Sequence, residues 1–142
     1  MTRDELIALA AKRTEAWDKC DAKALADTHA VHGVVVSPIF GEIHGRAAIE
    51  RSYADFFSIF ADLEWSGAPL IIDGDHVAEP FTVCGTHTKE FLGVPGSGRR
   101  FKIHGVLLFW FENGEITREE RVYDFSAMLI QLGVLKAKPG KA

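Results

Sequence analysis

The chain has 142 residues, of which 47% are hydrophobic and 25% charged, and we expect one globular domain with a substantial core. The net charge is −4, and the absence of a basic stretch interleaved with aromatic residues argues against nucleic-acid binding. No apolar run is long enough to span a membrane, and the N-terminus MTRDELIALA lacks a signal-peptide core. Cys20 and Cys84 lie far apart in the sequence, which favours a cytoplasmic protein with two reduced, buried thiols.

Three helices are predicted in the first 60 residues. Thr2 and Glu5 form a capping box, and the first helix runs from there to about residue 19. A short second helix covers residues 22–28, and a third covers residues 46–60. Two stripes at helical spacing are expected to face the core: Leu6, Ala10, Thr14 and Trp17 on the first helix, and Ile49, Tyr53, Phe56 and Phe60 on the third.

The other segments have the patterns of strands and turns. A strand is predicted over residues 33–38 and is followed by a turn at residues 41–45. Two further strands cover residues 63–72 and 76–88. Near the C-terminus, one or two helical turns are predicted over residues 126–132.

The stretch 101–125 predicts a long hairpin, because Asn113-Gly114 between alternating apolar runs favours a type I′ turn. Counted from this turn, the expected pairs are Phe111–Ile116, Phe109–Arg118, Leu107–Glu120, Gly105–Val122 and Ile103–Asp124. This set is the more apolar face, and we expect it to point inward. It carries Glu120 and Asp124, and an inward carboxylate is costly unless it is paired or used.

The order of the elements predicts an α+β fold. Strands joined by hairpins form a curved antiparallel sheet, and three helices across its open face complete a cone. Such a cone encloses one apolar cavity, which is the default place for a small ligand. We expect a single domain over residues 1–135 and a flexible tail over residues 136–142.

Several motifs match a known family. They are Gly85-Thr-His-Thr-Lys-Glu-Phe-Leu-Gly-Val-Pro95, Arg99-Arg-Phe101, Asn113-Gly-Glu-Ile116, Tyr123-Asp-Phe125 and Gln131-Leu-Gly133, with looser matches at Ser37-Pro38, Gly45-Arg46 and Ile49. Together they resemble the SnoaL-like polyketide cyclases of the nuclear transport factor 2-like superfamily. The resemblance implies a general-base Asp in the last strand, a position that Asp124 matches. It also implies a His on the preceding strand, where this chain has Leu107, and a Trp where it has Glu120.

Each candidate polar residue has two interpretations. Asp124 is either a general base with a pKa raised by burial, or a structural Asp that accepts backbone N–H groups. Glu120 is either a second acid in the pocket, or a solvent-exposed partner of Arg118. His87 either donates a proton to a substrate carbonyl, or holds the loop 93–98 in shape.

The other candidates concern ligand binding. His32 and Tyr53 are either hydrogen-bond donors in the pocket or polar-tipped core residues. Trp17, Phe40 and Phe57 belong to the core or to the pocket wall, and Leu107 and Glu120 complete the predicted binding set. His29 and His32 have no third partner at metal-ligand spacing, so we expect no metal. We also expect no other cofactor, because the sequence contains no dinucleotide fingerprint.

The function favoured by these patterns is a cofactor-independent enzyme acting on a small, largely apolar, oxygenated cyclic molecule. General-base catalysis by Asp124 would serve aldol-type ring closure or isomerisation, and less readily epoxide hydrolysis. The alternative is a non-catalytic small-molecule-binding protein, which Leu107 favours. Val106, Leu108, Trp110 and Tyr123 on the outer sheet face also predict a homodimer.

Overall fold

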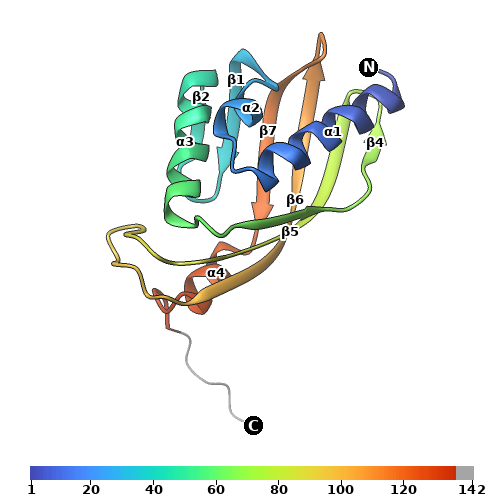
Figure 1. Cartoon of the computed structure of the whole chain (residues 1–142). Helices are drawn as coiled ribbons and strands as arrows, with labels where there is room; N and C mark the ends of the chain where they lie inside the picture. Colours follow the sequence, from blue (N-terminus) through green and yellow to red (C-terminus); the bar gives the residue numbers. More distant parts are fainter. Residues whose placement is uncertain (137–142) are drawn as a thin grey trace.

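Seven strands form one curved sheet, and helices pack across one of its faces in this computed structural model, which describes residues 1–136 (Figure 1). The elements are α1 Arg3–Asp18, α2 Ala22–Ala26, β1 His29–Ser37, β2 Gly41–His44, α3 Arg46–Ile59, β3 Glu64–Gly67, β4 Ile71–Asp73, β5 His76–Thr86, β6 Arg100–Glu112, β7 Glu115–Tyr123 and α4 Phe125–Gln131. The expected α+β fold is therefore confirmed. Except for Lys136, the tail predicted at residues 136–142 lies outside the described residues.

The sheet is mixed rather than antiparallel. Its strand order is β2-β1-β7-β6-β5-β3, with β4 paired beside β5, and β1 runs parallel to β7. No hairpin joins β1 to β7, so local turn geometry does not fix their relative direction. Two other expectations were wrong: the turn at 41–45 contains strand β2, and the strand expected over 63–72 is divided into β3 and β4 around Pro69.

The helix starts follow local capping chemistry. Glu5 N–H donates to Thr2 Oγ1 at 3.2 Å and Thr2 N–H donates to Glu5 Oε2 at 2.8 Å, so the capping box is confirmed. The buried residues of α1 are Leu6, Arg13, Ala16 and Trp17, so the inward stripe contains Arg13 where Thr14 was expected. An arginine therefore points from α1 toward the sheet.

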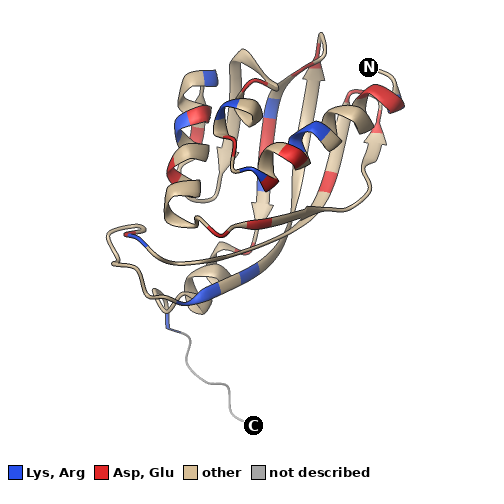
Figure 2. Cartoon of the chain, viewed as in Figure 1, with Lys and Arg blue, Asp and Glu red and all other residues tan. Residues whose placement is uncertain are grey.

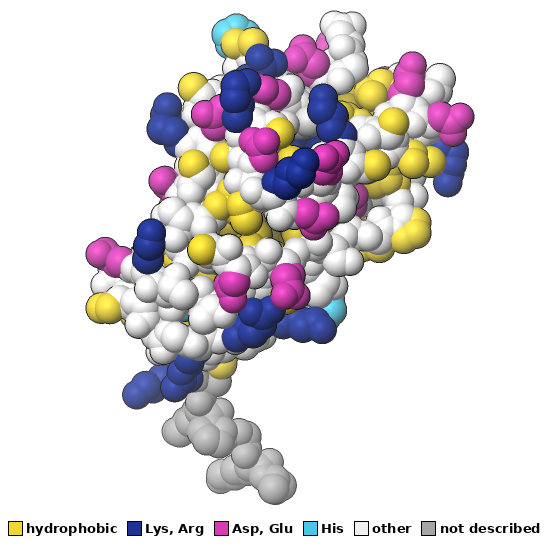
Figure 3. Space-filling model, viewed as in Figure 1, with side chains coloured by type: hydrophobic (Ala, Val, Ile, Leu, Met, Phe, Trp, Pro, Cys, Tyr) yellow, Lys and Arg dark blue, Asp and Glu magenta, His cyan; other side chains and the backbone are white. Residues whose placement is uncertain are grey.

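The core lies between the helices and the inner face of the sheet. α1 and α3 cover this face, and α4 lies at the end of β6 and β7 (Figure 1). Alternate residues of β5 and β6 face inward and are mostly large and apolar: Val77, Phe81, Val83, Phe101, Ile103, Leu107, Phe109 and Phe111. On the outside of the helical layer, acidic and basic side chains are interspersed (Figure 3).

A β-bulge in β7 changes which residues face the core. The turn places Phe111 opposite Ile116, as expected, but Trp110 then pairs with Arg118, so Thr117 has no partner in the ladder. Thr117 donates through Oγ1 to the Trp110 carbonyl oxygen at 3.1 Å. The one-residue shift exchanges the faces of the rest of β7. As a result Glu119, Arg121 and Tyr123 point inward instead of Arg118, Glu120 and Val122.

Candidate active site

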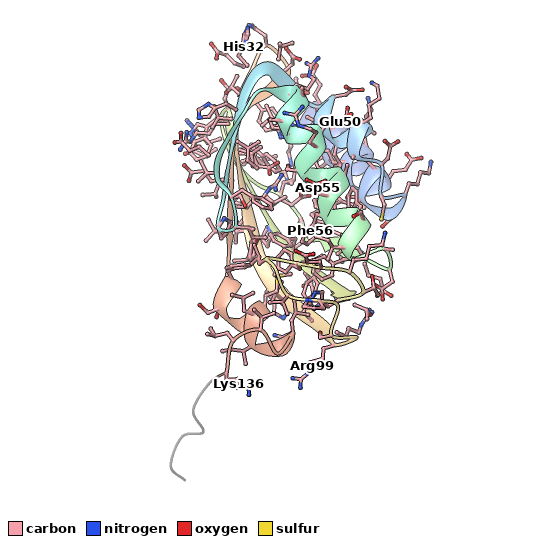
Figure 4. All side chains as sticks on the ribbon, turned by 90° about the vertical axis from the view of Figure 1, so that its left-hand side faces the viewer. His32, Glu50, Asp55, Phe56, Arg99 and Lys136 are labelled. Atoms are coloured by element: carbon pink, nitrogen blue, oxygen red, sulfur yellow. The ribbon has the colours of Figure 1, made fainter. Side chains whose placement is uncertain are left out.

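An apolar pocket of about 60 Å³ lies between the helices and the inner sheet face. Its walls come from both helical and sheet elements and from the turn after β1: Trp17, Ser37, Ile39, Phe40, Ser52, Tyr53, Phe56, Trp65, Phe81, Val83, Ile103, Leu107, Arg121, Tyr123 and Met128. We call this the main pocket. Figure 4 shows the outward side of α3 with Phe56 toward the end of the helix that lies nearer to α4.

Aromatic side chains form one rigid wall of the main pocket. The rings of Trp17 and Trp65 stack with centroids 5.3 Å apart, and Tyr53 meets Trp17 edge to face at 5.6 Å. Trp65 in turn stacks on Phe81 at 6.0 Å. Such a wall suits a flat or cyclic apolar molecule, because aromatic surfaces bury large areas with defined geometry.

Arg121 is the one charged residue that residues 1–136 contribute to this mostly apolar lining. Its Nε donates to Glu119 Oε2 at 2.6 Å, and its Cζ lies 4.8 Å from the centre of the Tyr53 ring. Its Nη2 is buried and has no acceptor among residues 1–136. The guanidinium is therefore held at one edge by Glu119, while its buried Nη2 has an unused capacity to donate a hydrogen bond.

Glu119 is the centre of a buried polar cluster behind Arg121. Its Oε1 accepts from Arg13 Nη2 at 3.2 Å and from Tyr53 OH at 3.3 Å, and lies 3.3 Å from His29 Nε2. Arg13 also donates to Thr28 Oγ1 at 2.6 Å. The cluster thereby joins α1, β1, α3 and β7, and Figure 2 shows charged residues of both signs along β7 behind the helices.

The cluster keeps Glu119 ionised and the arginines charged. Burial alone would raise the pKa of Glu119, but Arg121, the contact with His29 and Arg13 together hold that pKa well below its usual range. Burial likewise opposes the charge of Arg121, yet Glu119 keeps the pKa of the guanidinium above its ordinary value. For His29 burial dominates and lowers the pKa despite the neighbouring Glu119.

Three side chains in the lining of the main pocket carry donors that can face a ligand: Arg121, Trp17 and Tyr123. Trp17 Nε1, like Arg121 Nη2, is buried and has no acceptor within the described part of the chain. Burial raises the pKa of Tyr123 to about 12 against the opposing effect of Arg121, so its hydroxyl remains protonated. A ligand with hydrogen-bond acceptors, such as carbonyl or enolate oxygens, therefore matches these walls.

A second buried carboxyl, Glu79, lies on the inner face of β5. Only 3% of its surface is exposed, and burial raises its pKa to about 7 against the attraction of Arg13. It lines a small cavity of about 10 Å³ together with Arg13 and the apolar side chains of α1 and β6. Glu79 lies next to the main pocket in register, because the lining residue Leu107 is directly across from it.

The structure brings part of the predicted binding set together. Trp17, Phe40, Tyr53 and Leu107 all line the main pocket. Phe57 lies behind this wall, where its ring meets Trp17 at 5.5 Å. The site also contains residues from both ends of the chain, as expected for a cavity enclosed by helices and sheet.

The predicted inner-face positions of Asp124 and Glu120 are wrong, because the bulge reverses the faces of β7. Asp124 is exposed at the start of α4, where its Oδ1 accepts from Ala127 N–H at 2.9 Å. Glu120 accepts from Arg118 Nε at 3.0 Å on the opposite face from the main pocket. Both residues thus adopt the structural alternative, and the role of Asp124 as general base stays a prediction.

The two candidate histidines lie outside the main pocket. His87 is fully buried and accepts through Nδ1 from Ser97 N–H at 3.3 Å, so it holds the loop 93–98 in shape. His32 is exposed, because residues 30–33 bulge out between the paired residues His29 and Val34. Figure 4 shows His32 at the end of the molecule opposite Arg99 and Lys136.

Four residues of the site were not predicted from the sequence: Arg13, Glu79, Glu119 and Arg121. A signal existed for two of them. Arg13 is seven residues from Leu6 and four from Trp17, which is helical spacing, and Glu79 is in phase with Val77 and Phe81 in an alternating strand. For the two β7 residues no such signal exists, because both alternating rows of this strand carry charges.

Other expectations concern the cysteines, membranes and metals. Cys20 and Cys84 are unpaired, but both are only partly buried. Among residues 1–136, no helix is long and apolar enough to cross a membrane. The same residues contain no cluster of three or more His, Cys, Asp or Glu side chains suited to a metal ion.

The chain is similar to several solved structures of the same size. It is 26% identical to AclR from Streptomyces galilaeus, described as a candidate hydroxylase, with a TM-score of 0.83 over 97% of this chain and 91% of that one. It is 26% identical to IdmH from Streptomyces antibioticus, described as a candidate polyketide cyclase, with a TM-score of 0.73 over 89% of this chain and 97% of that one. TsrD from Streptomyces laurentii is 23% identical and shares the fold, with a TM-score of 0.84 over 95% of this chain and 99% of that one.

A comparison with curated protein sequences finds no match. The family model of the SnoaL-like polyketide cyclases, in contrast, matches residues 8–132, which include every residue that lines the main pocket. The chain belongs to the SnoaL-like polyketide cyclase family.

Proposed function

We propose that the protein is a cofactor-independent enzyme of the cyclase or isomerase type. Its substrate would be a small, largely apolar cyclic molecule that carries a carbonyl or enol oxygen. The observation that supports this most directly is the buried, unpartnered Nη2 of Arg121 in a mostly apolar wall. Family membership and the likeness to IdmH support the same reaction class.

In this proposal Arg121 stabilises the charge that develops on the substrate oxygen. When a proton leaves the carbon next to a carbonyl, the negative charge moves to that oxygen, where a preoriented guanidinium is most effective. The carbanion then attacks a second carbonyl in aldol-type closure, or regains a proton at another position in isomerisation. Trp17 Nε1 and the Tyr123 hydroxyl are further donors in the lining.

The alternative of a non-catalytic binding protein has one specific observation in its favour. The residues that line the main pocket include no carboxylate and no imidazole, and Leu107 occupies the position where the resemblance implies a His. A base must therefore be water or a carboxylate outside the lining, whereas binding alone requires none.

The test is a screen of cyclic ketones and enols by thermal shift, followed by turnover assays on every binder. Arg121→Lys keeps the charge but loses the planar fork, and we expect it to lower kcat by about 100-fold, as for loss of an oxyanion donor. Arg118→Lys is the matched control on the outer side of β7 and should behave as wild type.

Two results would count against the proposal. If wild type binds ligands that it never converts, the protein is a binder. If Arg121→Lys binds and converts substrates as well as wild type does, Arg121 is not the oxyanion donor.

A further inference from the structure

The charges of the buried cluster do not balance. Arg13 and Arg121 contribute two positive charges, and Glu119 contributes one negative charge. Arg13 is 2% exposed and Glu119 is fully buried, so solvent does little to screen this excess. The Nε of Arg13 has no acceptor among the described residues, in addition to Nη2 of Arg121. One further negative charge would be stabilised here.

Glu79 is one possible source of that charge. Glu79, Leu107 and Arg121 lie in one row across three neighbouring strands, because Leu107 pairs with Glu79 on one side and with Arg121 on the other. Two strand spacings separate Glu79 from Arg121, which is roughly 10 Å between Cα atoms. No residue among 1–136 donates a hydrogen bond to the Glu79 carboxyl, so it is not committed to another partner.

The surroundings of Glu79 contain few other charges. From α1 it faces Arg13, and from β7 it faces Glu119, behind which lie Arg121 and His29. The remaining neighbours from α1, β3, the segment before β4, β5 and β6 are uncharged: Leu6, Leu9, Ala10, Trp65, Gly67, Leu70, Val77, Leu107, Phe109 and Phe111. Burial is the main cause of the raised pKa of Glu79, and the charges that act on its ionisation belong to this one cluster.

A ligand in the main pocket is the other possible source of negative charge. An ionised oxygen placed at Arg121 Nη2 would meet a buried donor that has no protein acceptor. Trp17 Nε1 is a second such donor in the same lining. The ligand and Glu79 would then lie on opposite sides of Leu107, and the negative charge of each would interact with the same two arginines, Arg13 and Arg121.

We propose that the main pocket binds its ligand as an anion, an ionised enol or phenol, and that Glu79 takes up a proton from solvent as the ligand binds. The proposal rests on the proposed function in one respect, namely that the ligand oxygen contacts Arg121. In this step one O–H bond forms on Glu79 and one bond to hydrogen breaks on the buffer acid. The ligand brings one negative charge, and the proton neutralises another.

The pH dependence follows from this exchange. Burial raises the pKa of Glu79 to about 7, so the free protein holds about half a proton there at neutral pH. We take the Glu79–Arg121 Cα separation of roughly 10 Å as the distance between the Glu79 carboxyl and the ligand charge. At an effective dielectric constant near 20, two unit charges at this distance shift a pKa by about one unit. The anion therefore binds more tightly as the pH falls through 7, by up to about tenfold in total.

The test uses two probes of the same ring system. 4-Hydroxycoumarin is a cyclic enol that is an anion at neutral pH, and coumarin lacks the enol. Calorimetry at pH 7 in phosphate and in Tris, which differ in ionisation enthalpy, gives the protons taken up. For wild type we expect 4-hydroxycoumarin to bind more tightly than coumarin, with uptake of about 0.4 proton and roughly eightfold tighter binding at pH 5.5 than at pH 8.5.

Glu79→Gln should take up no proton and bind 4-hydroxycoumarin with the same affinity at both pH values. Glu120→Gln, which removes the same charge from the outer face, should behave as wild type. Proton uptake that persists in Glu79→Gln, or no binding of 4-hydroxycoumarin at millimolar concentration, would overturn the inference. If both probes bind wild type equally and Arg121→Lys weakens both, the anion preference fails while the donor role of Arg121 stands.

Discussion

Glu119→Gln is the substitution that most directly tests the buried cluster. The replacement keeps the shape of the side chain but removes the single negative charge between Arg13 and Arg121. One of the two carboxylate oxygens becomes an NH2 group. That group must face either Arg121 Nε, which donates at 2.6 Å in the wild type, or the donors gathered around Oε1.

The expected cost is about 3–5 kcal/mol, the range found when one partner of a buried ion pair is removed and the other remains uncompensated. This is a large share of a typical stability of about 5–15 kcal/mol. The pKa of Glu119 is depressed in the folded state, so its contribution is complete above the ordinary glutamate pKa and declines as the pH falls below it. The difference between wild type and variant should therefore shrink in acid.

The assay is urea unfolding followed by tryptophan fluorescence, at pH 7 and at pH 3.5. The matched control is Glu120→Gln, the neighbouring residue, whose partner Arg118 is also on the surface side of β7. An exposed pair of this kind contributes about 0–1 kcal/mol. The reasoning is refuted if Glu119→Gln costs less than 1 kcal/mol at pH 7, and the bulged register is refuted if Glu120→Gln is the more costly change.

Two further predictions concern the surface. Because Asp124 caps α4 through Ala127 N–H, Asp124→Asn should change the free energy of unfolding in urea by less than about 0.5 kcal/mol, whereas Asp124→Ala should lower it by about 1 kcal/mol. We expect Asp124→Asn to keep turnover. A loss of turnover of about 100-fold would instead identify Asp124 as the general base. The outer sheet face carries four apolar side chains, Val106, Leu108, Trp110 and Val122, of which Val122 is 54% exposed. We therefore expect light scattering at micromolar concentration to show a homodimer for wild type and a monomer for Trp110→Glu. A monomeric wild type would contradict the second expectation.

Local signals predicted much of the fold. Three features can each be recognised from a few neighbouring residues: the capping box at Thr2, the alternation of β5 and β6, and the Asn113-Gly114 turn. The structure contains all three. The parallel pairing of β1 with β7 could not be predicted in this way, because it joins strands that are about 80 positions apart in the chain. Such pairing is decided by the packing of the whole sheet.

The candidate site was harder to predict because one residue decided it. The Asn113-Gly114 turn was placed correctly, yet the register is lost four residues later at Thr117. Side chains alternate between the two faces of a strand with a period of two residues. A single inserted residue therefore exchanges the faces of all the residues that follow it. Residues before the bulge, such as Phe111 and Ile116, were therefore assigned correctly, while Asp124 and Glu120 were assigned to the wrong face.

The choice between the two faces of β7 also has an energetic reason. The row of Arg118, Glu120 and Asp124 would bring two carboxylates onto the inner face. The row of Glu119 and Arg121 brings a carboxylate with its own cation at 2.6 Å, and Arg13, Tyr53 and His29 complete its contacts. A buried charge is tolerated when it is paired and hydrogen-bonded, so this row is the less costly one to bury.

The same bulge places Arg121 beside Leu107 and in one row with Glu79. The chain has an apolar side chain at Leu107, where the resemblance implies a His, and carries ionisable groups on the strands at either side. An aliphatic spacer separates Glu79 from Arg121, so Arg121 has Glu119 as its ion-pair partner and its Nη2 stays without an acceptor among residues 1–136. Arg121 can then donate a hydrogen bond to a ligand oxygen, and Glu79 can take up a proton when the ligand adds its negative charge.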